Sequence, residues 1–181
     1  MIRRPPRSTL DRSSAASDVY KRQPERFLQM LQSRNLPASL LENLHVSRVT
    51  DTHKQIEILK TLDKNYFSLL IIDNITDLFS FEYSKKEHLI EKNTNFGNYM
   101  INLSQITQSE NIPIIITNQI FSHDETNYQR MHAHLENYIH QKIYLEKIKN
   151  KNTCTISSPF IHNTKFDYKM TDSGIEETES I

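Results

Sequence analysis

Two apolar runs in the chain each end on polar side chains of the kind that bind nucleotides and metal ions. Residues 69–72 (LLII) lead into Asp73, and residues 112–116 (IPIII) lead into the tripeptide Thr117–Gln119. Continuous runs of β-branched residues and leucine are typical of strands that are covered on both faces of a parallel sheet. Because ligands of such sheets bind at the carboxyl ends of the strands, the carboxylate and the amide are predicted to share one site. A nucleotide with its Mg²⁺ is the occupant that this pairing favours.

Each of the two side chains has a distinct chemical task in such a site. Mg²⁺ loses its water reluctantly, so the Asp73 carboxylate is expected to hold the ion through water. The Gln119 amide at the neighbouring strand tip can hydrogen-bond a terminal phosphate and transmit its presence to the segment that follows. An aspartate that ends a strand and starts a turn is also common without any ligand, and Asp73 alone leaves both interpretations open.

The elements that must position these tips are those of an α/β fold. The pattern predicts, in order, a helix from Pro24, a strand over 44–49, a helix capped by Asp51 or Thr52, a strand over 67–73, a helix over 98–110, a strand ending at Gln119, a short helix over 135–139, and strands over 142–146, 153–157 and 165–170. This order indicates a mostly parallel sheet with antiparallel C-terminal strands. Irregular polar connections over 74–98 and 121–134 follow the two tips, and connections of that length are usually functional.

Residues 1–23 resemble translated sequencing adapter more than protein. Residues 1–9 can be back-translated into a flow-cell adapter, and residues 13–23 into the transposase adapter that follows it in such libraries. Because the order, the reading frame and the gap all agree, we treat residues 1–23 as an artefactual, disordered leader. The alternative is a basic tail or a targeting peptide, although no apolar segment follows the arginines as a secretory signal requires.

The remaining 158 residues form a mildly acidic chain of single-domain size. Without the leader, the chain has 16 basic and 20 acidic residues, a net charge of −4. It therefore lacks the basic surplus of a nonspecific nucleic-acid binder, so any DNA contact must come from local segments or from an oligomer. The single Cys154 excludes an internal disulfide and fits a cytoplasmic protein, and no apolar run is long enough to span a membrane.

Five stretches of the chain resemble the RecA-like recombinases, most closely their archaeal RadA/RadB branch. These stretches are PERF (24–27), LLIIDNIT (69–76), IPIIITNQI (112–120), ENYIHQKIYLEK (136–147) and FDYKMTDSGIE (166–176). The resemblance implies that residues 24–177 form part of a RecA-like P-loop ATPase domain, truncated at its N-terminus, with residues 178–181 as a frayed tail. The TNQ strand is fairly specific to this family, whereas most P-loop ATPases share the LLIID strand.

The resemblance also implies roles for individual residues. Asp73 corresponds to the Walker B aspartate that is associated with Mg²⁺, and Gln119 to the residue that senses the phosphate of ATP. Residues 79–97 and 121–134 correspond to the two DNA-facing loops of the family. Their basic residues are expected to contact the phosphates of single-stranded DNA, with a solvated surface as the alternative for the lysines: Lys85, Lys86, Lys92 and Arg130.

The chain also departs from the family pattern. The Gly-rich phosphate loop with its lysine and the catalytic strand-end glutamate are expected upstream of Pro24, so this chain is expected not to hydrolyse ATP alone. The departures, including Asn74 in place of the usual serine, favour a divergent RadB-like protein of DNA repair and recombination. It is expected to act as a homo-oligomer or with related recombinase subunits. The alternatives are a KaiC-like signalling ATPase and a non-catalytic paralogue that serves as an assembly factor.

Overall fold

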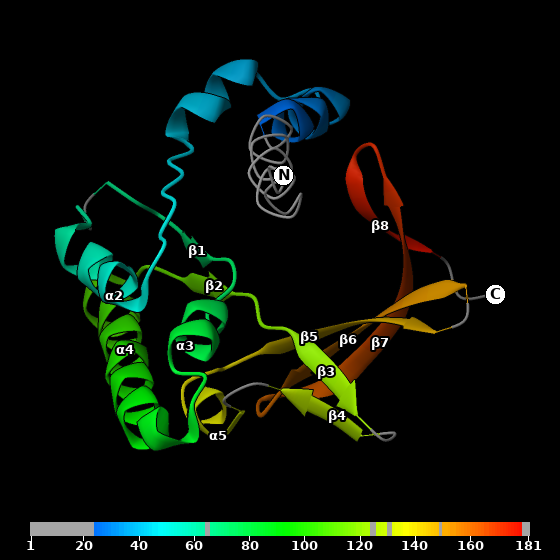
Figure 1. The fold of residues 1–181 in the computed structure, drawn as a ribbon. Coiled ribbons are helices and arrows are strands. Elements are labelled where there is room, and N and C mark those ends of the chain that lie inside the picture. Colours follow the sequence, from blue (N-terminus) through cyan, green and yellow to red (C-terminus); the bar gives the residue numbers. More distant parts are fainter. Residues whose placement is uncertain (1–23, 64–65, 124–125, 130–131, 149, 179–181) are drawn as a thin grey trace, which may run out of the picture. The chain divides into compact units, whose positions relative to one another are not determined.

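The computed structural model describes residues 24–63, 66–123, 126–129, 132–148 and 150–178. Within these ranges the chain divides into two compact units, whose helices and strands are drawn in Figure 1. One unit is Ser47–His140. The other combines the residues before Ser47 with those after His140. None of the helices in the described ranges is long and apolar enough to cross a membrane.

The unit Ser47–His140 contains the two strands whose tips the sequence singles out. Its elements are α2 (Thr52–Thr61), β1 (Leu70–Ile72), α3 (Asp77–Glu82), the 3-10 helix η2 (Lys86–His88), α4 (Leu89–Glu110), β2 (Ile114–Ile116), β3 (Ile120–His123), β4 (Thr126–Gln129) and α5 (His132–Glu136). Strands β1 and β2 are parallel, and Ile71 lies opposite Ile115. As expected from the sequence, Asp51 caps α2, because its carboxylate accepts a hydrogen bond from the Lys54 amide at 2.8 Å.

The hydrophobic core of this unit lies between its helices and one face of the β1–β2 pair. Phe79 of α3, Phe96 of α4 and Leu135 of α5 are fully buried in it. The side chains of Leu70 and Ile114 on the strands pack against this cluster. The helices thus hold the backbone of both strands from one side, which sets where their carboxyl ends lie.

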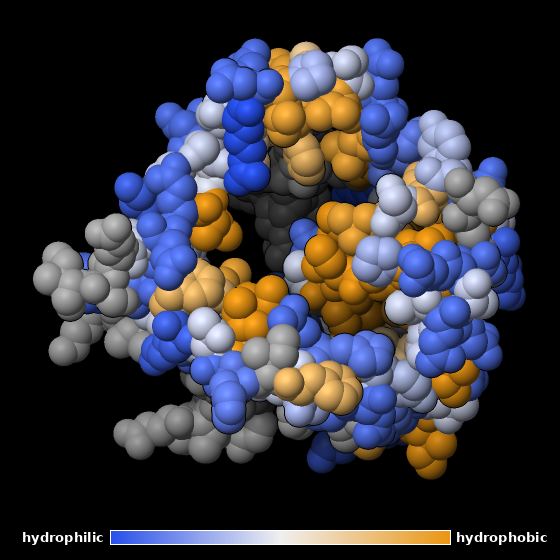
Figure 2. Space-filling model, turned by 180° about the vertical axis from the view of Figure 1, so that it is seen from behind, coloured by the Kyte–Doolittle hydropathy of each residue, from blue (hydrophilic) through white to orange (hydrophobic). Residues whose placement is uncertain are grey.

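The expectation that these strands are covered on both faces is wrong for the described residues. Side chains alternate between the two faces of a strand, so Ile71 and Ile115 point away from the core, and they are 55% and 51% exposed. Hydrophobic side chains therefore reach the surface of the molecule, where they are orange in Figure 2. An unbroken apolar run shows that both faces of a strand are hydrophobic. It does not show that another element packs on the second face.

The two connections expected to be irregular are largely regular. Within residues 74–98 the chain forms α3, η2 and the first turns of α4, which begins at Leu89 and not near residue 98. The described part of residues 121–134 forms the antiparallel hairpin of β3 and β4 and the start of α5. Polar composition suggested loops here, but a helix or hairpin tolerates polar residues when few of them face a core.

The second unit is a helix with a four-stranded antiparallel sheet. Residues 24–33 are helical, η1 (Ala38–Asn43) follows, and the sheet has the order β5 (Lys142–Ile148), β6 (Lys151–Ser158), β7 (Ile161–Thr171) and β8 (Gly174–Thr178). The α/β class with a parallel sheet and antiparallel C-terminal strands is thereby confirmed, and antiparallel pairing makes up the larger share of the described strands.

One local expectation is wrong, and another is tested at a single residue. Residues 44–49 are not a strand, since no described strand pairs with them and the alternating Leu44 and Val46 are both exposed. Of the tail predicted to be frayed, Thr178 pairs with Asp167 as part of β8, and residues 179–181 lie outside the described residues. Alternation alone does not make a strand when no partner is available for its backbone groups.

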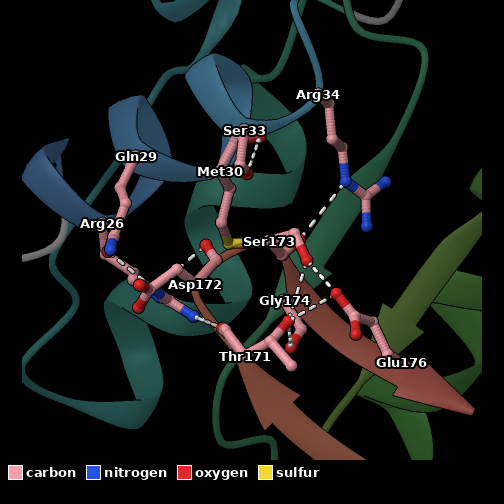
Figure 3. A network of polar contacts seen from close by, with 10 residues as sticks. All are labelled: Arg26, Gln29, Met30, Ser33, Arg34, Thr171, Asp172, Ser173, Gly174 and Glu176. Carbon is pink, nitrogen blue, oxygen red and sulfur yellow. Dashed lines mark hydrogen bonds and ion pairs between the residues drawn. The ribbon is translucent and has the colours of Figure 1, made fainter.

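The helix of residues 24–33 docks on the turn between β7 and β8 (Figure 3). The Arg26 guanidinium donates to the backbone carbonyls of Thr171 and Asp172 at 2.5 and 3.2 Å. Gly174 has a φ of +117°, and a Cβ placed there would lie 3.0 Å from Cε of Met30. The PERF and MTDSG stretches, both of which carry the family resemblance, therefore contact each other. This contact requires glycine at position 174.

Candidate functional site at the ends of β1 and β2

The structure places the two predicted strand tips side by side. The Thr117 amide donates to the Ile72 carbonyl at 3.0 Å, and the Ile75 amide donates to the Thr117 carbonyl at 3.1 Å. The backbone pairing of β1 with β2 thus continues past the end of both strands. Because the register is fixed on both sides of it, Asp73 lies at the same edge as the Thr117–Gln119 tripeptide.

Side-chain hydrogen bonds also join the tips. The Thr117 hydroxyl donates to the Asp73 carboxylate at 2.5 Å, and the Thr76 hydroxyl donates to Oδ1 of Asn118 at 2.7 Å. Thr76 is fully buried, and its backbone amide donates to Oδ1 of Asn74 at 2.9 Å. The prediction from sequence gave roles to Asp73 and Gln119, and it gave none to the two threonines, although both lie in the stretches that were singled out. The only signal for them is their position beside the named polar residues.

The Asp73 carboxylate is suited to an indirect role at a metal ion. It is exposed, and Thr117 already occupies one of its oxygens. In the part of the chain that the structure describes, no group of three His, Cys, Asp or Glu side chains is placed to bind a metal. A single carboxylate of this kind fits Mg²⁺ that is held mainly by water and by phosphate oxygens.

Gln119 lies at an open hollow of about 610 Å³ next to α3. The other lining residues are Asp77, Ser80, Phe81 and Ser84, and all of them come from α3 and the turn that follows it. The hydroxyl oxygen of Ser80 is buried and has no hydrogen-bond partner in the described residues. The hollow itself therefore combines the amide of Gln119 with the aromatic ring of Phe81.

The end of α3 is tied to the start of α2. The Glu82 carboxylate accepts hydrogen bonds from the Thr52 amide at 2.9 Å and from the Thr52 hydroxyl at 2.5 Å. A carboxylate at the N-terminus of a helix is favoured by the helix dipole and by the free amides there. This contact holds the wall of the hollow against the body of the unit.

Of the three lysines predicted to contact DNA, one lies in the short connection between α3 and η2, and two lie in helices. Lys85 precedes η2, Lys86 lies in η2, and Lys92 lies in α4. The Lys85 ammonium lies 3.6 Å from the Glu87 carboxylate. Across residues 79–97 three lysines are balanced by three glutamates, so this segment has no net charge. Arg130 lies outside the described residues.

The order of the strands, the polar tips and the C-terminal sheet can now be compared with known proteins. The sequence model of the Rad51 family matches residues 19–178. The chain belongs to the Rad51 family. The match begins within the stretch assigned to adapter, and that assignment stays a prediction.

Individual relatives agree with the family. The chain is 28% identical to the DNA repair and recombination protein RadA of Cenarchaeum symbiosum over 86% of its length, and 25% identical to RadA of Ignicoccus hospitalis over 86%. It is 29% identical to the meiotic recombination protein DLH1 of Candida albicans over 55%. These alignments cover 42%, 51% and 32% of the relatives, so the chain spans about half of their length or less. The predicted RecA-like recombinase relationship on the archaeal RadA side is confirmed.

Proposed function

We propose that this chain is part of a RadB-like ATPase of DNA repair and recombination that binds ATP–Mg²⁺ and single-stranded DNA. The observation that carries the proposal is the paired strand tip, in which Thr117 bonds Asp73 two residues before Gln119. Membership of the Rad51 family and the names of the RadA relatives support DNA repair and recombination as the process.

The residues at the ends of β1 and β2 would have different roles in nucleotide binding. Asp73 would hold Mg²⁺ through water, and the ion would supply positive charge against the phosphates of ATP. Gln119 would hydrogen-bond the terminal phosphate. Since the Thr117–Gln119 tripeptide leads directly into β3, a change at Gln119 reaches the β3–β4 hairpin without an intermediate element. Nucleotide state would thus bias the segment that the family resemblance assigns to DNA, an order–disorder coupling.

The direct test measures binding of labelled single-stranded DNA by fluorescence anisotropy, with and without ATP–Mg²⁺, at two salt concentrations. Sequencing the source DNA across the codons for Arg22 to Pro24 first establishes which residues precede Pro24, and the protein of the native gene is then used. ATP is expected to tighten DNA binding in the parent protein. Gln119→Ala is expected to abolish the ATP effect and leave ATP-independent DNA binding in place.

Gln108→Ala is the matched control, because Gln108 on α4 is exposed and, among the described residues, its amide donates to the Ser104 hydroxyl one turn away on the same helix. ATP-dependent DNA affinity that is equal in Gln119→Ala and in the parent would refute the role of Gln119. Absence of DNA binding by the parent at both salt concentrations would refute the proposed function itself.

One observation favours a second candidate. Residues 79–97 have no net charge, whereas a segment that binds DNA through phosphate contacts usually carries a basic surplus. A KaiC-like signalling ATPase, whose corresponding segments bind protein, has no such requirement. The salt series separates the two functions, because only a DNA-binding protein shows affinity for the oligonucleotide that falls as salt rises.

A further inference from the structure

Phe81 is the exposed aromatic residue of α3. Two residues earlier, Phe79 is fully buried and lies edge-on to Phe96, with the ring centroids 5.0 Å apart. Phe81 lies on the other side of the helix and is 82% exposed. A single exposed apolar side chain is ordinary in a folded protein. The exposure of Phe81 therefore indicates a binding site only if the neighbouring residues also suit a ligand.

The surroundings of Phe81 are the hollow beside Gln119. Phe81 lines this hollow of about 610 Å³, a volume within the range of small-ligand sites. The polar lining residues are Asp77, Ser80, Ser84 and Gln119. An aromatic face next to hydrogen-bonding groups is suited to a flat, polar-edged ring such as a nucleobase.

The net charge of residues 79–97 favours contact with a DNA base over contact with DNA phosphates. Residues 79–97 carry equal numbers of lysines and glutamates, and the Glu87 carboxylate lies 3.6 Å from the Lys85 ammonium. A binding mode based only on phosphates needs a surplus of cations, which this segment lacks. Stacking of a base on an aromatic ring needs none, since every base has a π-face.

We infer that Phe81 is a stacking platform for an unpaired base of single-stranded DNA, with Gln119 at the edge of the same hollow. This inference rests on the proposed function and deepens it, because it names which part of the nucleic acid this surface recognises. Duplex DNA is a poor ligand for such a platform, since its bases are already stacked on each other. The contact also places a DNA base beside the strand tip that would sense nucleotide.

The experiment uses the absence of tryptophan from the sequence. In Phe81→Trp the new indole is the single tryptophan among residues 1–181, and stacking of a base on it is expected to quench its emission, measured against the emission of the parent protein. The probe is an unlabelled oligothymidylate, titrated at low and at high salt. Phe81→Ala is expected to weaken binding of a labelled oligothymidylate by about 10- to 100-fold, the range for losing one stacked base. Phe81→Tyr is expected to retain the parent affinity.

Phe160 provides the matched control, because it is 81% exposed and does not line the hollow. Phe160→Ala is expected to bind as the parent does, and Phe160→Trp is expected to show no quenching. Circular dichroism of each variant checks that the fold is retained. Retention is expected because the rings of Phe81 and Phe160 are both exposed.

The possible failures can be told apart. Absence of binding by the parent overturns the proposed function and the stacking inference with it. Parent-like binding by Phe81→Ala, together with unquenched emission of Phe81→Trp, overturns the stacking inference and leaves the proposed function standing. Emission that depends on protein concentration without DNA identifies Phe81 as a self-association contact and also overturns the inference.

Discussion

Thr76→Val tests whether a buried side-chain bond holds the two strand tips together. The Thr76 hydroxyl is fully buried and donates to Oδ1 of Asn118 at 2.7 Å. Valine has nearly the shape of threonine, so the substitution leaves no cavity and removes mainly the hydroxyl. The Thr76 hydroxyl also lies 3.2 Å from Oδ1 of Asn74, so the loss of stability reports on both contacts, and a double-mutant cycle is needed to isolate the bond to Asn118.

The expected magnitude follows from the burial of this bond. Removing one partner of a buried neutral pair costs about 1–3 kcal/mol, because the remaining acceptor keeps its desolvation penalty. Thr76 bonds an amide and not an ionised group, so we expect the lower half of this range, about 1–2 kcal/mol. Thr61→Val is the matched control. The Thr61 hydroxyl makes a 3.0 Å bond to the Ile58 carbonyl on an exposed surface, and its loss is expected to cost less than about 0.5 kcal/mol.

Urea denaturation followed by circular dichroism gives the free energy of unfolding of each variant. An unchanged urea dependence shows that both variants expose the same surface on unfolding. A double-mutant cycle with Asn118→Ala isolates the pair, and a coupling energy of at least 0.5 kcal/mol is expected for residues in contact. Equal stability of Thr76→Val and Thr61→Val, or strictly additive effects in the cycle, would refute the argument that this bond joins the tips.

Three further predictions concern groups outside the tips. Burial raises the pKa of Tyr99 from 10.0 to about 12, so the parent should lose about 2 kcal/mol of unfolding free energy relative to Tyr99→Phe as pH rises from 10 to 12. Parallel pH profiles of the two proteins would contradict this. Gly174→Ala should cost about 1–3 kcal/mol in a urea titration because φ is +117°, and adding Met30→Ala should not restore stability, since the strain lies in the backbone. Hydrogen bonds from Ser173 and Thr171 lower the pKa of Glu176, so the stability difference between the parent and Glu176→Gln should be present above pH 4.5 and vanish as pH falls through the lowered pKa; a difference that persists in acid would count against these bonds.

The strand tips could be predicted from sequence because their signals are local. An apolar run that stops at a polar residue marks a strand and its end within a few positions, and β1 and β2 lie where the runs of residues 69–72 and 112–116 place them. That Asp73 lies close to the Thr117–Gln119 tripeptide could be predicted from a general property of parallel sheets. The carboxyl ends of neighbouring parallel strands lie at the same edge of the sheet.

The regular structure of residues 74–98 was not predictable in the same way. Ile75, Phe79 and Tyr83 recur at helical spacing, but over only about two turns, and the polar run of residues 84–88 interrupts the pattern before Leu89. Tertiary contact decides the outcome, since Phe79 is drawn into the core and Glu82 is bonded to Thr52, which fixes α3 between them. Phe81 is left exposed as a consequence.

The sequence by itself determined the α/β class, the family and the two polar tips, because each of these follows from the order of residues along the chain. The tertiary structure alone decided that Thr76 meets Asn118 and that the outer face of β1 is exposed. Thr76 and Asn118 are 42 positions apart, so their bond depends on the register between strands, which no local pattern specifies. Exposure likewise depends on which elements pack on a face, and that is a property of the assembled unit.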